Sequence, residues 1–101
     1  MNPYQRAIAH FGETAQKEKA IEELKELIAE LWCELQHSNY DIRRIVSEIA
    51  DVQNMLIQLI MIYEIDIRVS LEMKCKMART MGRIDKEEAA EHDKRTNSGT
   101  C

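Results

Sequence analysis

The sequence predicts an all-α protein, a four-helix bundle built on an antiparallel helical hairpin. The chain of 101 residues contains only three Gly and one Pro, so little interrupts helical patterning between Glu13 and Met81. Apolar residues recur at helical spacing through two long segments, and one polar break separates these segments. A composition of 45% hydrophobic and 32% charged residues is typical of one globular domain.

The first two helices are expected on either side of Gly12. Asn2 to Phe11 form a short helix in this interpretation, and Gly12 ends it because glycine adopts positive φ without a steric penalty. One long amphipathic helix then runs from Glu13 to about Gln36. Its apolar stripe consists of Ala20, Ile21, Leu24, Leu27, Ile28, Leu31 and Leu35.

A third helix is expected after the polar break at residues 37–39. Ser38 and Asn39 are good N-cap residues, and apolar residues then repeat with helical period from Ile42 to Tyr63. The second half of this helix is apolar nearly all round, and about 100 residues form too small a body to cover it. We therefore expect a homodimer or a homotetramer with this helix at the interface.

A fourth helix is expected to begin near Asp66 and to end towards Gly82 or Ile84. The composition then becomes polar, without apolar periodicity. The expected organisation is a helical domain over residues 1–84 and a polar, disordered tail over residues 85–101.

Charge and cysteine content exclude several classes of function. The net charge of −4 gives no general electrostatic reason to bind nucleic acid or an anionic membrane. The three cysteines have no C-x-x-C spacing, so neither a disulfide framework nor a zinc site is expected. The first ten residues do not read as a signal peptide, and Met55 to Tyr63 is too short to span a bilayer. We expect a cytoplasmic protein.

Two pairs of acidic residues hold equivalent places on the two long helices. Glu23 and Glu26 on one helix, and Glu48 and Asp51 on the next, are each three residues apart and therefore neighbours on a helix surface. In an antiparallel hairpin the pairs can face each other, and a hard divalent cation such as Mg²⁺ or Mn²⁺ relieves the repulsion among such carboxylates. Glutamate is also a strong helix former, so the alternative is a solvated acidic face.

These acids also form a pattern found in a known family. Glu22-Glu23-x-x-Glu26, followed after twenty-one residues by Glu48-x-x-Asp51, resembles the EExxE…ExxD signature of the MazG-like all-α nucleotide pyrophosphohydrolases. The flanking segments, among them His10-Phe11-Gly12, resemble the short members of that family from phages and Gram-positive bacteria. The resemblance covers roughly residues 4–84.

The resemblance implies an enzyme that splits a nucleoside or deoxynucleoside triphosphate into the monophosphate and pyrophosphate, in the service of nucleotide-pool cleaning. By position, the Mg²⁺ ligands would be Glu23, Glu26, Glu48 and Asp51. The catalytic carboxylates would be Glu22, Glu23 and Glu26, and the general base stays open between Glu22, Glu30 and a ligating carboxylate. A metal neutralises phosphate charge and activates water, so such a protein mainly supplies carboxylates and positioning.

A basic stripe on the fourth helix is a candidate phosphate contact. Lys76, Arg79 and Arg83 share one face of that helix and resemble the K-x-x-R-x-x-x-R segment with which short family members end. A guanidinium suits phosphate oxygens. The alternative is a solvated helix end whose cations favour the C-terminal dipole.

Other candidate substrate contacts lie near the acids. Lys17 is a candidate phosphate contact, and Asn54, three residues past Asp51, is a candidate nucleoside contact whose alternative is an ordinary polar surface residue. Lys19 and Lys25 are expected to face solvent.

Two other functions stay open on the sequence. One is a phosphoribosyl-ATP pyrophosphohydrolase-like enzyme, because such enzymes share the resembled superfamily. The other is a helical interaction protein without enzymatic activity, whose acids are only a solvated face. Metal dependence separates this second alternative from both enzymes.

Overall fold

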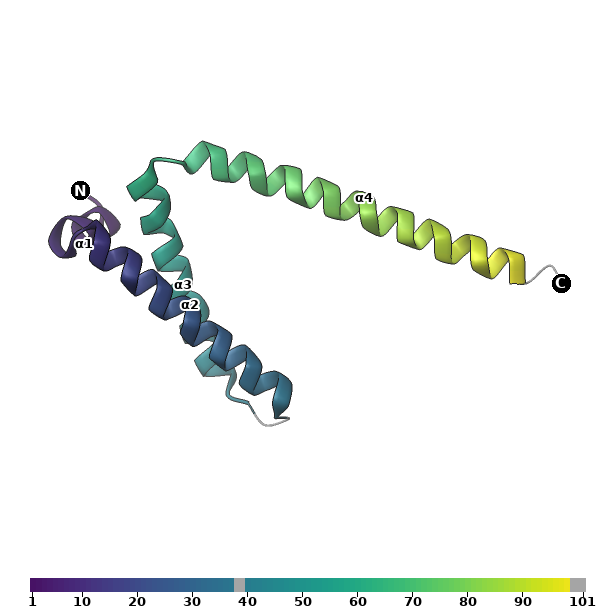
Figure 1. Cartoon of the computed structure of the whole chain (residues 1–101), viewed down its shortest axis with the longest axis horizontal. Coiled ribbons are helices and arrows are strands. Elements are labelled where there is room, and N and C mark those ends of the chain that lie inside the picture. Colours follow the sequence, from purple (N-terminus) through teal and green to yellow (C-terminus); the bar gives the residue numbers. More distant parts are fainter. Residues whose placement is uncertain (38–39, 99–101) are drawn as a thin grey trace. The chain divides into compact units, whose positions relative to one another are not determined.

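The computed structural model describes residues 1–37 and 40–98, with side chains for residues 1–37 and 40–95, and this part of the chain forms four helices and no strand (Figure 1). The helices are α1 (Pro3–Phe11), α2 (Glu13–Gln36), α3 (Ile42–Tyr63) and α4 (Asp66–Ser98). The all-α prediction is therefore confirmed. The chain divides into two compact units, the first ending at Ile65 and the second beginning at Asp66.

Local hydrogen bonds fix both ends of α1. The Asn2 side chain accepts a hydrogen bond from the backbone N–H of Gln5 at 2.8 Å, and the Gln5 side chain accepts one from the backbone N–H of Asn2 at 2.8 Å. Gly12 ends the helix with φ 92° and ψ 155°, and its N–H donates to the carbonyl oxygen of Ile8. Gly12 is thus the boundary between α1 and α2, as the sequence predicts.

Helices α2 and α3 run antiparallel and side by side, and α1 packs against both of them (Figure 1). Asp41 caps α3, because its side chain accepts a hydrogen bond from the backbone N–H of Arg43 at 2.9 Å. The expected cap residues, Ser38 and Asn39, lie outside the described residues. Helix α3 ends at Glu64, which is in the left-handed region with φ 54°.

The contact between α2 and α3 buries a mixture of apolar and polar side chains. The buried apolar residues are Ala20, Val52 and Met55, and the buried polar residues are Gln16, Glu23 and Gln58. These buried residues form the seam between α2 and α3. At about 100° per residue, they lie roughly a quarter turn around each helix from the middle of its apolar stripe. Leu24 and Ile49, in the middle of those stripes, are 40% and 42% exposed.

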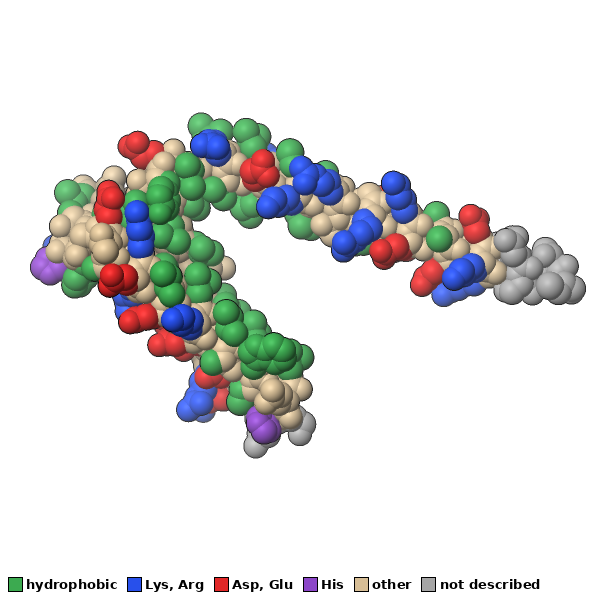
Figure 2. All heavy atoms as spheres, in the orientation of Figure 1, with side chains coloured by type: hydrophobic (Ala, Val, Ile, Leu, Met, Phe, Trp, Pro, Cys, Tyr) green, Lys and Arg blue, Asp and Glu red, His purple; other side chains and the backbone are tan. Residues whose placement is uncertain are grey.

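A set of large apolar side chains on the hairpin is consequently exposed, and we call it the open apolar face. Hydrophobic side chains lie uncovered along one side of the hairpin in Figure 2. The residues of this face are Ile21, Leu24, Ile28, Leu31 and Leu35 on α2, with Val46, Ile49 and Leu56 on α3. An apolar patch of this extent is typical of a surface that another molecule covers.

By length and composition alone, α3 is apolar enough to cross a membrane. It has 22 residues with a mean hydropathy of 1.4 over its most apolar stretch, of which 17% is buried. The apolar helix is therefore longer than the segment from Met55 to Tyr63 on which the sequence prediction was based. Core helices of soluble proteins meet the same criteria of length and composition, and α3 also carries Glu48 and Asp51, which are costly to place in hydrocarbon.

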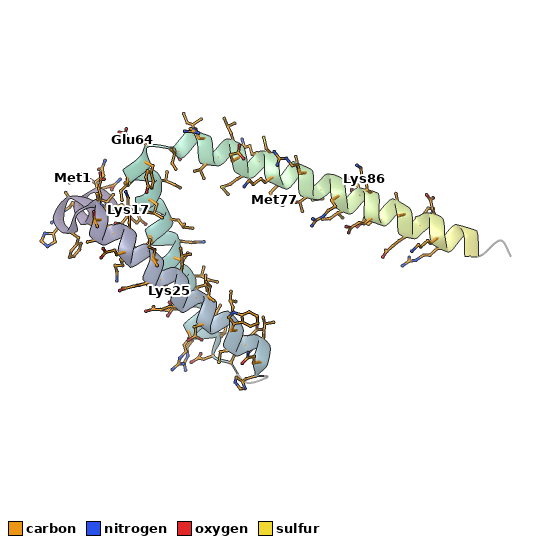
Figure 3. All side chains as sticks on the ribbon, in the orientation of Figure 1. Met1, Lys17, Lys25, Glu64, Met77 and Lys86 are labelled. Carbon is orange, nitrogen blue, oxygen red and sulfur yellow. The ribbon has the colours of Figure 1, made fainter. Side chains whose placement is uncertain are left out.

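Helix α4 continues beyond the end predicted at Gly82 or Ile84, and that prediction was wrong. Residues 85–91 are mostly Lys, Glu and Ala, which are strong helix formers, and Arg83 lies 3.9 Å from Glu87 one turn later. Apolar periodicity governs how a helix packs, so its loss does not end the helix. Met77 and Lys86 extend from opposite sides of α4 (Figure 3).

Candidate functional site

Three glutamates from the two helices of the hairpin come together at the seam. Carboxylate oxygens of Glu23, Glu26 and Glu48 all lie within 4.8 Å of one another. Glu23 and Glu26 are neighbours along α2, and α3 supplies Glu48 from across the seam. Glu23 is buried with 8% exposure, Glu48 is half-buried and Glu26 is exposed. The hairpin thus joins one acidic pair to part of the other.

Two oxygens of this cluster are buried without a hydrogen-bond partner among the described residues, Glu23 Oε2 and Glu48 Oε2. The other oxygen of Glu23, Oε1, lies 3.3 Å from Lys19 Nζ. A buried carboxylate oxygen without a partner raises the free energy of the folded state. A hard divalent cation satisfies such oxygens, so the residues present fit Mg²⁺ or Mn²⁺.

Asp51 lies in the lining of a cavity of about 410 Å³ that it shares with Glu23. It is half-buried and is not part of the three-glutamate group. The cavity is lined by Ala7, Phe11, Gln16, Lys19, Glu23, Asp51, Asn54, Met55 and Gln58. Residues of α1, α2 and α3 therefore enclose a space next to the acids.

Of the two lysines near the acids, Lys19 and not Lys17 lines the cavity. Lys17 Nζ lies over the ring of Tyr63, 4.7 Å from its centroid, and Lys17 does not line the cavity. Lys19 is 55% exposed, as expected, and it is also paired with Glu23 and lines the cavity. The pairing follows from the i, i+4 spacing of Lys19 and Glu23 on α2. Lys25 is exposed, as expected.

Asn54 also lines the cavity, in agreement with its place beside the acids. Its Oδ1 accepts a hydrogen bond from the hydroxyl of Tyr4 at 3.1 Å. This bond orients the side chain and leaves the two N–H groups of the amide as donors. Glu22 is exposed and lies outside the three-glutamate group, and Glu30 is paired with Arg44 at 3.9 Å.

The sequence prediction missed a buried pair of amides in the cavity lining. Gln16 Nε2 donates a hydrogen bond to Gln58 Oε1 at 2.6 Å, across the seam between α2 and α3. A usable signal was present, because Gln58 interrupts the otherwise apolar run from Met55 to Ile62. A lone amide in such a run needs a polar partner when the helix is buried.

The basic stripe of Lys76, Arg79 and Arg83 is exposed on α4, in the second compact unit. Arg83 Nε lies 3.9 Å from Glu87 Oε1, and both side chains are largely exposed. An exposed pair of this kind contributes little to stability. The three cations are therefore accessible to an anionic ligand.

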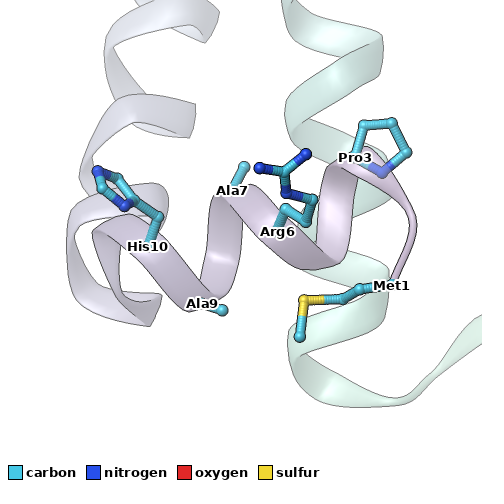
Figure 4. Close-up of a pocket in the computed structure, with 6 residues that line it drawn as sticks. All are labelled: Met1, Pro3, Arg6, Ala7, Ala9 and His10. Atoms are coloured by element: carbon cyan, nitrogen blue, oxygen red, sulfur yellow. The ribbon is translucent and has the colours of Figure 1, made fainter.

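A larger cavity, of about 550 Å³, lies along α1 (Figure 4). It is lined by Met1, Pro3, Arg6, Ala7, Ala9 and His10. Within the described part of the chain this lining contains one Arg and one His and no carboxylate. The cavity beside the glutamates holds the side chains suited to metal and phosphate chemistry, and it is the candidate functional site.

Comparisons of the chain with protein-family models, with curated proteins and with solved structures found no match. The function must therefore be inferred from the residues of the cavity and from their geometry.

Proposed function

We propose that the protein is a divalent-metal-dependent hydrolase that cleaves nucleoside or deoxynucleoside triphosphates to the monophosphate and pyrophosphate. The observation that carries the proposal is the pair of buried oxygens without partners, Glu23 Oε2 and Glu48 Oε2, within a group of three carboxylates. The resemblance of the acidic pattern to MazG-like enzymes supports the same function. Mg²⁺ is the expected metal and Mn²⁺ a substitute.

The acidic residues in and next to the cavity would bind the metal. Glu23, Glu26 and Glu48 would hold the cation, and Asp51 would complete the ligand set from the cavity side. A bound metal supplies neutralisation of phosphate charge and activation of a water. The exposed stripe on α4 stays a separate candidate for binding phosphate groups, as the resemblance implies.

Lys19 is a further candidate phosphate contact in this scheme. Its ammonium neutralises Glu23 in the absence of a cation, at 3.3 Å from Oε1. A divalent cation on Glu23 would repel the ammonium, and the lysine lines the cavity where a phosphate would lie. Lys19 is thus placed to move from carboxylate to phosphate when metal and substrate bind.

The open apolar face supports a second candidate, a helical interaction protein without enzymatic activity. Large side chains such as Ile28, Leu31 and Leu35 are 54%, 43% and 72% exposed. In that case the function would lie in the partner that covers this face, and divalent metals would have no effect on it.

A screen of nucleoside triphosphates with Mg²⁺ tests the proposed function. Separate assays for pyrophosphate and orthophosphate identify which bond is broken. We expect pyrophosphate and the nucleoside monophosphate from wild type and from Glu18→Gln, whose carboxylate is exposed on α2 outside the cluster. Glu23→Gln should be inactive. Orthophosphate as the product, or turnover that persists in excess EDTA, would exclude the proposed reaction.

A further inference from the structure

We infer that the cavity beside the three glutamates binds the nucleobase of the substrate, and that Gln16 and Gln58 recognise the hydrogen-bonding edge of that base. The inference rests on the proposed function for its substrate class. It gives the buried amide pair a role in substrate recognition that is separate from metal binding.

The amide pair offers hydrogen bonds that its own contact does not use. Gln16 and Gln58 are 5% and 6% exposed, and one bond of 2.6 Å joins them. Each amide carries two N–H donors and an oxygen with two lone pairs. The only other side-chain hydrogen bond of the pair within the described residues is a weak one, from Gln58 Nε2 to Met55 Sδ at 3.8 Å. A donor and an acceptor therefore stay available side by side in the cavity wall.

A nucleobase presents the matching chemistry. The hydrogen-bonding edge of each base carries a donor next to an acceptor. Asn and Gln amides recognise such an edge with two hydrogen bonds, one donated and one accepted. A ligand without that edge leaves buried polar groups without partners, and a site of this kind rejects it strongly. Inorganic polyphosphate lacks such an edge.

The other walls of the cavity suit a flat aromatic ring. Phe11 lines the cavity and is nevertheless 62% exposed, so its ring is available for stacking. Ala7 and Met55 add apolar surface, and the N–H donors of Asn54 lie in the same lining. The volume of about 410 Å³ is within the range of small-molecule sites.

The spacing along α2 places base and phosphates at opposite ends of the cavity. Gln16 and Glu23 are seven residues apart, which corresponds to about 10 Å along a helix axis. A nucleoside spans a similar distance from the edge of its base to its 5′ oxygen. A triphosphate bound with its base at Gln16 would thus bring its phosphates to the glutamates.

The double variant Gln16→Leu/Gln58→Leu tests the inference, because it removes both amides together and keeps similar volumes. Its control is Gln53→Leu, an exposed amide on α3. We expect the variant to lose about tenfold or more of the kcat/KM ratio between preferred and poor nucleotides, whereas inhibition by inorganic tripolyphosphate stays unchanged. Unchanged preference among bases would overturn the inference while the proposed function stands.

A second variant and a second measurement cover the remaining outcomes. If the double variant does not fold, Phe11→Leu should raise KM for nucleotides about tenfold without changing inhibition by tripolyphosphate, and an unchanged KM would overturn the inference. If wild type hydrolyses no nucleotide, the proposed function fails by itself. Nucleoside monophosphates should then still shift the side-chain amide NMR signals of Gln16 and Gln58 but not of Gln53, and the absence of such shifts would overturn the inference.

Discussion

At the scale of single residues, the glutamate cluster is expected to lower the stability of the metal-free protein. Glu48 brings a carboxylate oxygen without a partner close to Glu23, whose second oxygen is in the same state. We predict that Glu48→Gln abolishes hydrolysis and raises the stability of the metal-free protein by about 1 kcal/mol, because an amide N–H can donate to a neighbouring carboxylate. Thermal unfolding in EDTA measures the change. Glu34→Gln, at a half-buried acid outside the cluster, is the control, and equal shifts in both variants would contradict the prediction.

The junction of α1 and α2 is a second point where one residue decides the local structure. Gly12 has φ 92° and ψ 155°, a conformation that other residues rarely adopt, and no atom lies within 4 Å of an added Cβ. We predict that Gly12→Ala lowers the free energy of unfolding by about 1–3 kcal/mol through backbone strain alone. Gly82→Ala, inside α4 and equally free of contacts, should instead be neutral or stabilising. Urea unfolding measures the free energy of unfolding of both variants. Similar decreases in this free energy would contradict backbone strain at Gly12 as the cause.

At the scale of helices, the sequence predicts the elements better than it predicts their contacts. Helical periodicity and Gly12 locate α1, α2 and α3 because these signals are local. The seam between α2 and α3 was harder to predict, since it buries Gln16, Glu23 and Gln58 and leaves much of the apolar stripe exposed. Hydrophobicity alone does not indicate polar burial of this kind. The length of α4 was underestimated because the prediction weighed apolar periodicity above helix propensity.

The basic stripe on α4 allows a prediction at the same scale. Arg79 lies between Lys76 and Arg83 on one face of the helix, and all three are exposed. We predict that Arg79→Ala lowers kcat/KM for triphosphates about tenfold or more and leaves the metal affinity of the free protein unchanged, because a charge-assisted contact to phosphate is lost. Lys86→Ala, two turns further along α4, is the control. Equal kcat/KM for Arg79→Ala and wild type would show that Arg79 is a solvent-exposed cation without a contact to the substrate.

At the scale of the whole molecule, the open apolar face is expected to pack against another copy of the chain. Within the described residues only Ala20, Val52 and Met55 form the buried apolar core, whereas most large apolar side chains of the hairpin are exposed. We predict a dimer or tetramer in solution, and light scattering should give at least about twice the chain mass of 11.8 kDa. Leu31→Glu should shift the assembly to smaller species, whereas Ala29→Glu, on another side of α2, should not.

Two results would contradict this assembly. One is a monomer at micromolar concentration with full activity. The other is co-flotation of the purified chain with lipid vesicles, which would show that the apolar surface of α3 meets a membrane instead of a second copy.

Binding of Mn²⁺ in the absence of nucleotide tests the glutamate cluster most directly. Electron paramagnetic resonance measures free Mn²⁺ during a titration, and it does not depend on turnover. We predict saturable binding by wild type and by Glu18→Gln, with affinity lower by about tenfold or more in Glu23→Gln and in Glu48→Gln, because each loses a charged ligand from the cluster. Equal affinity in all four proteins, or no binding by wild type at millimolar Mn²⁺, would contradict a metal site at Glu23, Glu26 and Glu48.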